Sequence, residues 1–468
     1  MLEEAKRVFA GTGVQMVDGA RDLGVAIGSV GFVQKYMSKK CNEWIKQIEM
    51  LSVFAKYDPH SAHQAFVSCL RLRWNYAQGT MKILDIELLP LEAVIRSKFI
   101  PVLLQGRSLS DDERVLFSLP GALAGMALDN PAADAPFKLA ASIERTQPLT
   151  ELIVEQKLHL AKDTLSRVKA AKLSAKKDKE LHQKSIYDKL YERLPKDLQL
   201  ACDWAREKGG SALVTTLPLA AENFHLHRQG WCDAVYMRYS WHPPGLPSVC
   251  ACGQPFSVQH SQICHVSGFV DMRHENVSKV VLNALKKCLN NVGWEPVLQP
   301  VPDVIKASFK KSANIEDGAR ADISADSFWN KNQTAFFDTR VFYPFAASYS
   351  AKGISAAYNH HNKEKKREYS QRINQVERGT FTPLVFSSTG SCDKETTVVL
   401  KKTAGMVAEK TGQEYSHVFS LLRVRIAFDL IHSSLRCLRG TRNYRSKSHN
   451  HQKSIPDEVV NHYAGITE

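Results

Sequence analysis

Residues 319–345 read ARADISADSFWNKNQTAFFDTRVFYPF, and this stretch decides the fold class of the second half of the chain. Two runs, 319–329 and 334–345, carry apolar, aromatic and β-branched residues, and the polar residues NKNQ separate them. Runs of this length bounded by a polar turn predict two β-strands. The sequence therefore predicts a small sheet here, which needs helices to cover its apolar faces.

Helical patterns flank the two predicted strands. Residues 271–291 place Val277, Val281 and Leu285 on one apolar stripe, which predicts a helix. We expect a second helix at 355–378, a short strand in TPLVFSS (382–388), and helices at 403–411 and 414–439. The predicted order αββαβα is typical of a mixed α/β domain, which we assign to residues 271–440.

The first half of the chain reads differently. Residues 1–30 are rich in glycine and valine, like the interior of a sheet domain, so we expect Met1 not to begin a complete fold. Residues 33–100 predict helices, 119–136 (LPGALAGMALDNPAADAP) predict loops, and the lysine-rich residues 148–195 predict a long solvated helix. The prediction is a multidomain protein, α-rich with α/β. Its predicted parts are 1–135, a basic helical linker 136–220, a cysteine-containing region 221–270, the α/β domain, and a basic flexible tail 441–468.

Charge and cysteine usage limit the partners and the compartment. The chain of 468 residues has a formal net charge of +14, which favours a polyanionic partner, usually nucleic acid. A merely basic soluble protein is the alternative. No apolar run reaches the roughly 18–20 residues of a membrane span, and the first residues lack the apolar core of a signal peptide. We therefore expect an intracellular protein without a membrane partner, whose 10 cysteines stay reduced.

Residues 250–264, CACGQPFSVQHSQIC, concentrate potential metal ligands. Zinc prefers four nitrogen or sulfur ligands, and closely spaced pairs let one short loop supply two of them. Gly253 permits the tight turn that such a loop needs. The pattern C-x-C-x7-H-x3-C predicts a structural zinc site, with chance clustering as the alternative. The predicted ligands are Cys250, Cys252, His260 and Cys264, with His265 or His242 as substitutes.

The two predicted strands also carry a pair of carboxylates, Asp322 and Asp338. If the strands pair antiparallel, these side chains converge at one end of the hairpin. Mg²⁺ prefers oxygen ligands, and such a site can activate water for attack on a phosphodiester. The alternative is that each aspartate forms an ion pair with Arg320 or Arg340.

The helix that follows adds lysines to this arrangement. Its sequence KEKKREYSQR (363–372) contains Lys365 and Lys366, and one amine pointing inward would neutralise charge that develops on a phosphate. The alternative is a basic face that only contacts water.

Together, the cysteine cluster and the acidic hairpin resemble the C-terminal end of site-specific non-LTR retrotransposon polyproteins. In that family a CCHC zinc knuckle lies between a reverse transcriptase and a PD-(D/E)XK-like, restriction-like endonuclease. DGARDLGVAIGS (18–29) is similar to the segment after the polymerase palm, and the helices after it are similar to the thumb. The resemblance extends to RHENV (273–277), AFFDTRVFYPFA (335–346) and GTFTPLVFSSTG (379–390).

The resemblance implies roles for individual residues. Ala321-Asp322 stands where the family has Pro-Asp, and Asp338 takes the D/E position. Arg340 occupies the position of the motif lysine, where it would contact phosphate, and Lys365 or Lys366 would supply the migrated amine. Glu295 would be an early acidic ligand, with Gln299-Pro300 as the alternative to that assignment. The implied cofactors are structural Zn²⁺ and catalytic Mg²⁺ or Mn²⁺.

The resemblance also implies an activity, namely nicking of target DNA by a nuclear protein that binds DNA and possibly element RNA. No Tyr-x-Asp-Asp motif occurs, so we expect no polymerase activity from this chain. The knuckle has H-x3-C where the family usually has H-x4-C. The alternatives are a catalytically inactive nucleic-acid-binding module and a retroelement relic without function.

Overall fold

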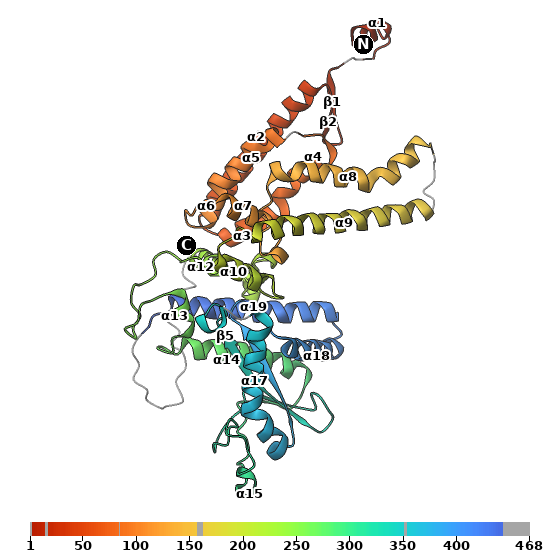
Figure 1. The fold of residues 1–468 in the computed structure, drawn as a ribbon. Helices are drawn as coiled ribbons and strands as arrows, with labels where there is room; N and C mark the ends of the chain where they lie inside the picture. Colours follow the sequence, from red (N-terminus) through yellow and green to blue (C-terminus); the bar gives the residue numbers. More distant parts are fainter. Residues whose placement is uncertain (1, 15–16, 84, 157–161, 351–352, 443–468) are drawn as a thin grey trace.

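The computed structural model describes residues 2–14, 17–83, 85–156, 162–350 and 353–442. Figure 1 shows a helical part that contains α2 to α9, a central group with α10 and α12, and a part in which helices cover a small sheet. The predicted class, α-rich with α/β, is confirmed. Most of the predicted tail 441–468 lies outside the described residues.

The helical part begins with a short helix and a two-stranded hairpin. Gly28 at the end of this hairpin has φ of 152°, and a Cβ there would lie 2.3 Å from the Gly19 Cα, so only glycine fits. Two π-helical turns, Phe66–Leu70 and Ile95–Phe99, join consecutive helices. The elements are α1 (Leu2–Val8), β1 (Gly19–Asp22), β2 (Val25–Gly28), α2 (Val30–Ala55), α3 (Pro59–Ala65), α4 (Arg71–Thr80), α5 (Asp85–Val94), α6 (Ile100–Leu103) and α7 (Asp111–Ser118).

Two long helices, α8 (Pro131–Val154) and α9 (Lys162–Tyr191), run side by side away from this body (Figure 1). The prediction of loops through residue 136 was wrong, because α8 already starts at Pro131. Proline suits the first turn of a helix, where its missing N–H has no partner to lose. The Asn130 side chain caps this end by accepting hydrogen bonds from the backbone N–H groups of residues 132 and 133.

The largest core runs from Ala26 to Tyr239. The last turns of α9 contribute Tyr187 and Leu190 to it, and Trp231 is fully buried in it. Residues 187–239 therefore pack on the N-terminal helices through α10 (Lys196–Arg206), α11 (Ala212–Thr215) and α12 (Arg228–Arg238).

The mixed part contains a four-stranded sheet of order β3-β4-β5-β6. β3–β4 and β4–β5 are antiparallel, and β5–β6 is parallel, with α17 as the crossover. The elements are α13 (Val258–Ile263), α14 (Phe269–Cys288), β3 (Val292–Trp294), α15 (Asp303–Lys306), β4 (Ile323–Asp326), β5 (Thr334–Phe342), α16 (Ala347–Ser350), α17 (Ile354–Arg372), β6 (Thr380–Ser387), α18 (Lys394–Thr411) and α19 (Tyr415–Arg439).

The predicted hairpin is confirmed, but the element order αββαβα was incomplete. β3 was missed because it has only 3 residues, too few for an alternating pattern. α18 begins at Lys394 rather than at 403, because the Asp393 side chain caps it by accepting from the N–H groups of Glu395 and Thr396.

Alternating residues of β5 face two different cores. Phe337 packs with α14, α18 and α19, whereas Phe336 packs with Tyr369 and Ile373 at the end of α17. The two cores place α17 on one face of the sheet and the other three helices on the opposite face. Within the described ranges, no helix combines the length and apolar character needed to cross a membrane.

Candidate metal centre and acidic site

The cysteine cluster is built on a tight turn and one short helix. Cys250 N–H donates to the Gln254 carbonyl (2.9 Å), and Gly253 N–H donates to the Cys250 carbonyl (2.8 Å), with Gly253 at φ 84°. This left-handed conformation is why glycine follows the second cysteine. His260 lies in α13, whose first turn is capped by the Ser257 hydroxyl, an acceptor 3.0 Å from the His260 N–H.

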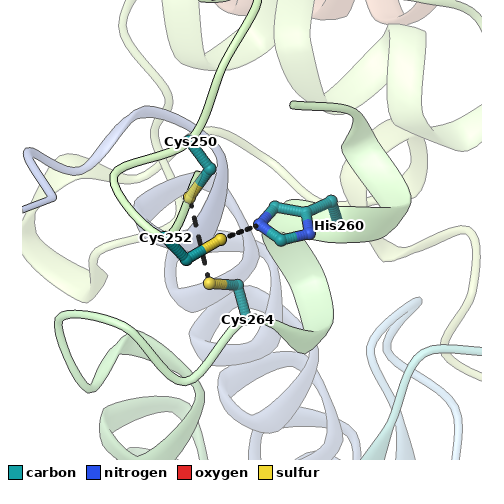
Figure 2. A group of neighbouring side chains, drawn as sticks. All are labelled: Cys250, Cys252, His260 and Cys264. Atoms are coloured by element: carbon teal, nitrogen blue, oxygen red, sulfur yellow. Dashed lines mark hydrogen bonds between the residues drawn. The ribbon is translucent and has the colours of Figure 1, made fainter. Parts of the chain in front are cut away.

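The four predicted ligand atoms lie within 4.8 Å of one another. Cys250 Sγ is 3.9 Å from Cys264 Sγ, and Cys252 Sγ is 3.2 Å from His260 Nε2 (Figure 2). A tetrahedral zinc with Zn–S near 2.3 Å sets its sulfur ligands about 3.8 Å apart. These side chains can therefore hold one metal ion.

The two alternative histidines do not join this group. The His265 side chain is 77% exposed and its Nδ1 lies 3.7 Å from Asp271. His242 is also exposed and lies outside the cluster.

Backbone groups favour a thiolate in this turn. The backbone N–H of Gln254 lowers the pKa of the Cys252 thiol. Burial instead raises the pKa of Cys264, and this effect outweighs a hydrogen bond from the Val266 backbone that lowers it. A soft cation that binds the thiolates would remove this cost.

The cluster region holds α13 against α14 and α19. Cys250 and Cys264 pack against Leu438 near the end of α19. The Gln262 amide donates to the Ser434 carbonyl (3.0 Å). Arg273 on α14 is only 1% exposed. Its guanidinium donates to the side-chain oxygen (2.7 Å) and the main-chain oxygen (2.9 Å) of Gln262.

The acidic site lies at one end of the β4–β5 hairpin. Because Ile323 pairs with Phe337, Asp322 and Asp338 take neighbouring positions on adjacent strands. Lys365 Nζ reaches in from α17 and lies 2.7 Å from Asp338 Oδ2, with side-chain exposures of 16% and 5%. Two carboxylates and one amine from three elements therefore meet.

Asp322 also holds the backbone of β5. β4 begins at Ile323, opposite Phe337, so the N–H and carbonyl of Thr339 have no partner on that strand. The Thr339 N–H donates to Asp322 Oδ2 (2.6 Å), and His274 Nε2 lies 3.0 Å from the Thr339 carbonyl oxygen and 3.0 Å from Asp322 Oδ2. The sequence prediction gave His274 no role, although it lies in the RHENV motif.

Burial and the neighbouring Asp322 carboxylate raise the pKa of Asp338 to about 6, although Lys365 opposes this shift. Burial disfavours a charged Lys365, but the Asp338 carboxylate outweighs it and raises the pKa of Lys365. Burial likewise opposes a charge on His274, and its hydrogen bond to Asp322 raises the pKa of His274. The lysine therefore remains an ammonium group at neutral pH.

The structure separates the two candidate lysines. Lys366 Nζ points to α18, 2.6 Å from Glu395, and its side chain is 43% exposed. Arg340 is exposed and follows Asp338 by two residues on β5, so both project from the same face. Burial is the main cause that lowers the pKa of His361, and the charge of Arg340 lowers it further.

The early acidic candidate contacts the site through its backbone. The Glu295 N–H donates to the Asp322 carbonyl (2.9 Å), whereas its carboxylate lies 3.5 Å from Arg320 Nη1. The alternative, Gln299, is exposed and pairs with Glu377.

A basic concavity lies on the outer side of α17. Among the described residues that line it, none is acidic. They are Lys310, His360, Lys363, Lys366, Arg367, Ser370, Gln371, Asn374 and Gln375.

No protein-family model matches the chain, and no curated protein matches it in a sequence comparison.

Proposed function

We propose that this chain is a DNA-binding protein with a metal-dependent, restriction-like endonuclease domain, and that it derives from the C-terminal part of a non-LTR retrotransposon polyprotein. The observation that carries the proposal is the Asp338–Lys365 ion pair beside Asp322. The chain would nick target DNA in the nucleus and would not polymerise DNA. Element RNA is a further partner in this proposal.

The order of elements around the site supports this assignment. Apart from the four-residue helices α15 and α16, the order is a helix, three antiparallel strands, a crossover helix and a parallel strand, α14-β3-β4-β5-α17-β6. This is the order expected of a PD-(D/E)XK-like core, with Asp322 and Asp338 on its central hairpin. Lys365 on the crossover helix would then serve as the migrated lysine.

The donor set fits a divalent cation. Asp322 and Asp338 offer carboxylate oxygens, the donors that Mg²⁺ and Mn²⁺ accept. A bound cation would supply Lewis-acid activation of water and of the scissile phosphate. The Lys365 ammonium, kept charged by Asp338, would stabilise negative charge on the phosphate in the transition state.

Substrate binding would use the basic surface on the outer side of α17, together with Arg340. Lys363 and Arg367 line the concavity, and none of its described lining residues is acidic. Arg340 lies on the same face of β5 as Asp338. Such cations bind the sugar–phosphate backbone and position the duplex without reading its sequence. In this proposal the cysteine cluster binds a structural zinc and holds the knuckle against the nuclease.

The test is a nicking assay with purified full-length protein, supercoiled plasmid and Mg²⁺ or Mn²⁺. Conversion to open circles that requires the cation supports the proposal. A second candidate is an inactive DNA-binding module, favoured by Arg340 at the position of the motif lysine. DNA binding without nicking under either cation would select that candidate.

Lys365→Met should reduce the nicking rate by about a hundredfold or more, since one well-placed charged donor contributes a factor of about 10² to 10³. Lys366→Met removes the same charge from the next residue but leaves Asp338 paired. Lys366→Met should change the nicking rate less than about threefold, because the Lys366 amine contacts Glu395 and not Asp338. The measurement is the initial nicking rate at saturating DNA and cation, because Lys366 also lines the basic concavity. Equal losses in both variants would contradict the role of Lys365.

The affinity for duplex DNA should fall steeply with salt. Each phosphate contact adds about 0.9 to the slope of log K against log salt concentration. Lys363→Gln combined with Arg367→Gln should therefore reduce that slope by about 2. Lys401→Gln with Lys410→Gln, on α18 across the sheet, is the matched control and should leave it unchanged. A slope that the α17 pair does not alter would move the DNA surface elsewhere.

A further inference from the structure

We propose that His274 is a nitrogen ligand of the divalent-cation site, and that this site therefore selects Mn²⁺ over Mg²⁺. The inference rests on the proposed nuclease site and adds to it the class of cation.

Three donor atoms already lie at ligand spacing. His274 Nε2 is 3.0 Å from Asp322 Oδ2 and 3.0 Å from the Thr339 carbonyl oxygen. Neighbouring ligands of an octahedral ion at about 2.1 Å stand about 3 Å apart. Asp338 belongs to the same group, since the β4–β5 register places it opposite Asp322.

A hydrogen bond alone leaves this group incompletely satisfied. The Nε2–H bond can point at only one of the two oxygens, and Asp322 Oδ2 already accepts from the Thr339 N–H. A cation bound by neutral imidazole nitrogen and both oxygens would satisfy all three. The same cation would reach toward Asp338, whose carboxylate now contacts Lys365.

The neighbours of His274 on α14 fix this helix against α13 and β5. Arg273 is anchored to Gln262, and the Ser278 hydroxyl donates to Thr339 Oγ1 (2.8 Å). The His274 side chain remains 35% exposed, so an ion can reach it from solvent.

Ligand chemistry gives the selectivity. Mg²⁺ demands oxygen donors and keeps its waters, whereas imidazole suits first-row transition metals. A site with two carboxylates and one imidazole therefore favours Mn²⁺ more than an all-carboxylate site does. His274→Asp converts the first donor set into the second.

The experiment measures ion binding to the full-length, zinc-loaded protein at fixed pH. Mn²⁺ binding is followed by EPR, and Mg²⁺ is measured by competition. His274→Asp should reduce the Mn²⁺/Mg²⁺ affinity ratio by about tenfold. Pulsed EPR of bound Mn²⁺ should show coupling to a directly coordinated ¹⁴N.

His274→Gln should remove this ¹⁴N coupling while its amide still donates to the Thr339 carbonyl, and the melting temperature checks the fold. His360→Gln, an exposed histidine on the outer side of α17, should retain the coupling.

The outcomes separate the inference from the function on which it rests. Bound Mn²⁺ without ¹⁴N coupling, or an affinity ratio unchanged in His274→Asp, overturns the inference alone, provided that Asp322→Asn and Asp338→Asn abolish binding. Failure of the wild-type protein to bind either cation overturns both.

Discussion

Asp338→Asn should abolish cation-dependent nicking, with a loss of at least about a thousandfold. Charge stabilisation by a bound metal is worth several kcal/mol, and about 4 kcal/mol corresponds to a factor of 10³ in rate. The variant keeps the size of the side chain but removes the charge that holds the cation and orients Lys365. The initial nicking rate on supercoiled DNA measures the effect.

The Asp338→Asn variant should remain folded, because the ionised Asp338 side chain destabilises the native state. The pKa of Asp338 is about 6, above the unfolded value of about 3.9. A raised folded pKa means that the native state gains from the protonated form, and that this gain is lost as pH rises from about 4 through 6. At pH 7 asparagine therefore removes an unfavourable charge, which offsets the loss of the Lys365 partner. The melting temperature without divalent cations measures the balance.

Asp326→Asn is the matched control. Asp326 lies at the other end of β4, where its carboxylate accepts from Asn291 and Thr334. It should retain nicking within a few fold, and both variants should bind DNA like the wild type because binding uses the basic surface. If Asp338→Asn nicks as fast as the wild type, the acidic site is not the active site.

Short-range patterns predicted which side chains come together in the two candidate sites, for a physical reason. The four candidate ligands from 250 to 264 must stay close because the chain between them is short. Asp322 and Asp338 meet because a hairpin turns the chain back on itself, so an antiparallel register of Ile323 with Phe337 is enough. Neither inference needed the rest of the molecule.

Side chains from distant elements could not be assigned from the sequence. Lys365 and Lys366 are neighbours whose directions differ by about 100° around a helix axis. Only the packing of α17 through Tyr369 and Ile373 shows that Lys365 faces the sheet. His274 was missed because its partner at Asp322 depends on how α14 crosses the sheet, and no local pattern encodes that crossing.

Loss of one zinc ligand should have the other large effect. Cys264→Ala removes a buried sulfur ligand from the cluster. Purified protein should fall from about one equivalent of zinc to nearly none, since closed ligand sets owe their tight binding to all four donors. Elemental analysis after dialysis measures the content. Cys69→Ser, an exposed cysteine outside the cluster, is the control and should keep its zinc.

Loss of zinc should also weaken divalent-cation binding at the acidic site. α13 is held to Arg273 through Gln262, and His274 is the next residue on α14. Without zinc the turn 250–264 loses its cross-link, so hydrogen exchange should increase there first and then in the first turns of α14. Divalent-cation affinity should fall along with zinc content, whereas Cys69→Ser should change neither. A Cys264→Ala protein with a full equivalent of zinc would show that these four side chains are not the ligand set.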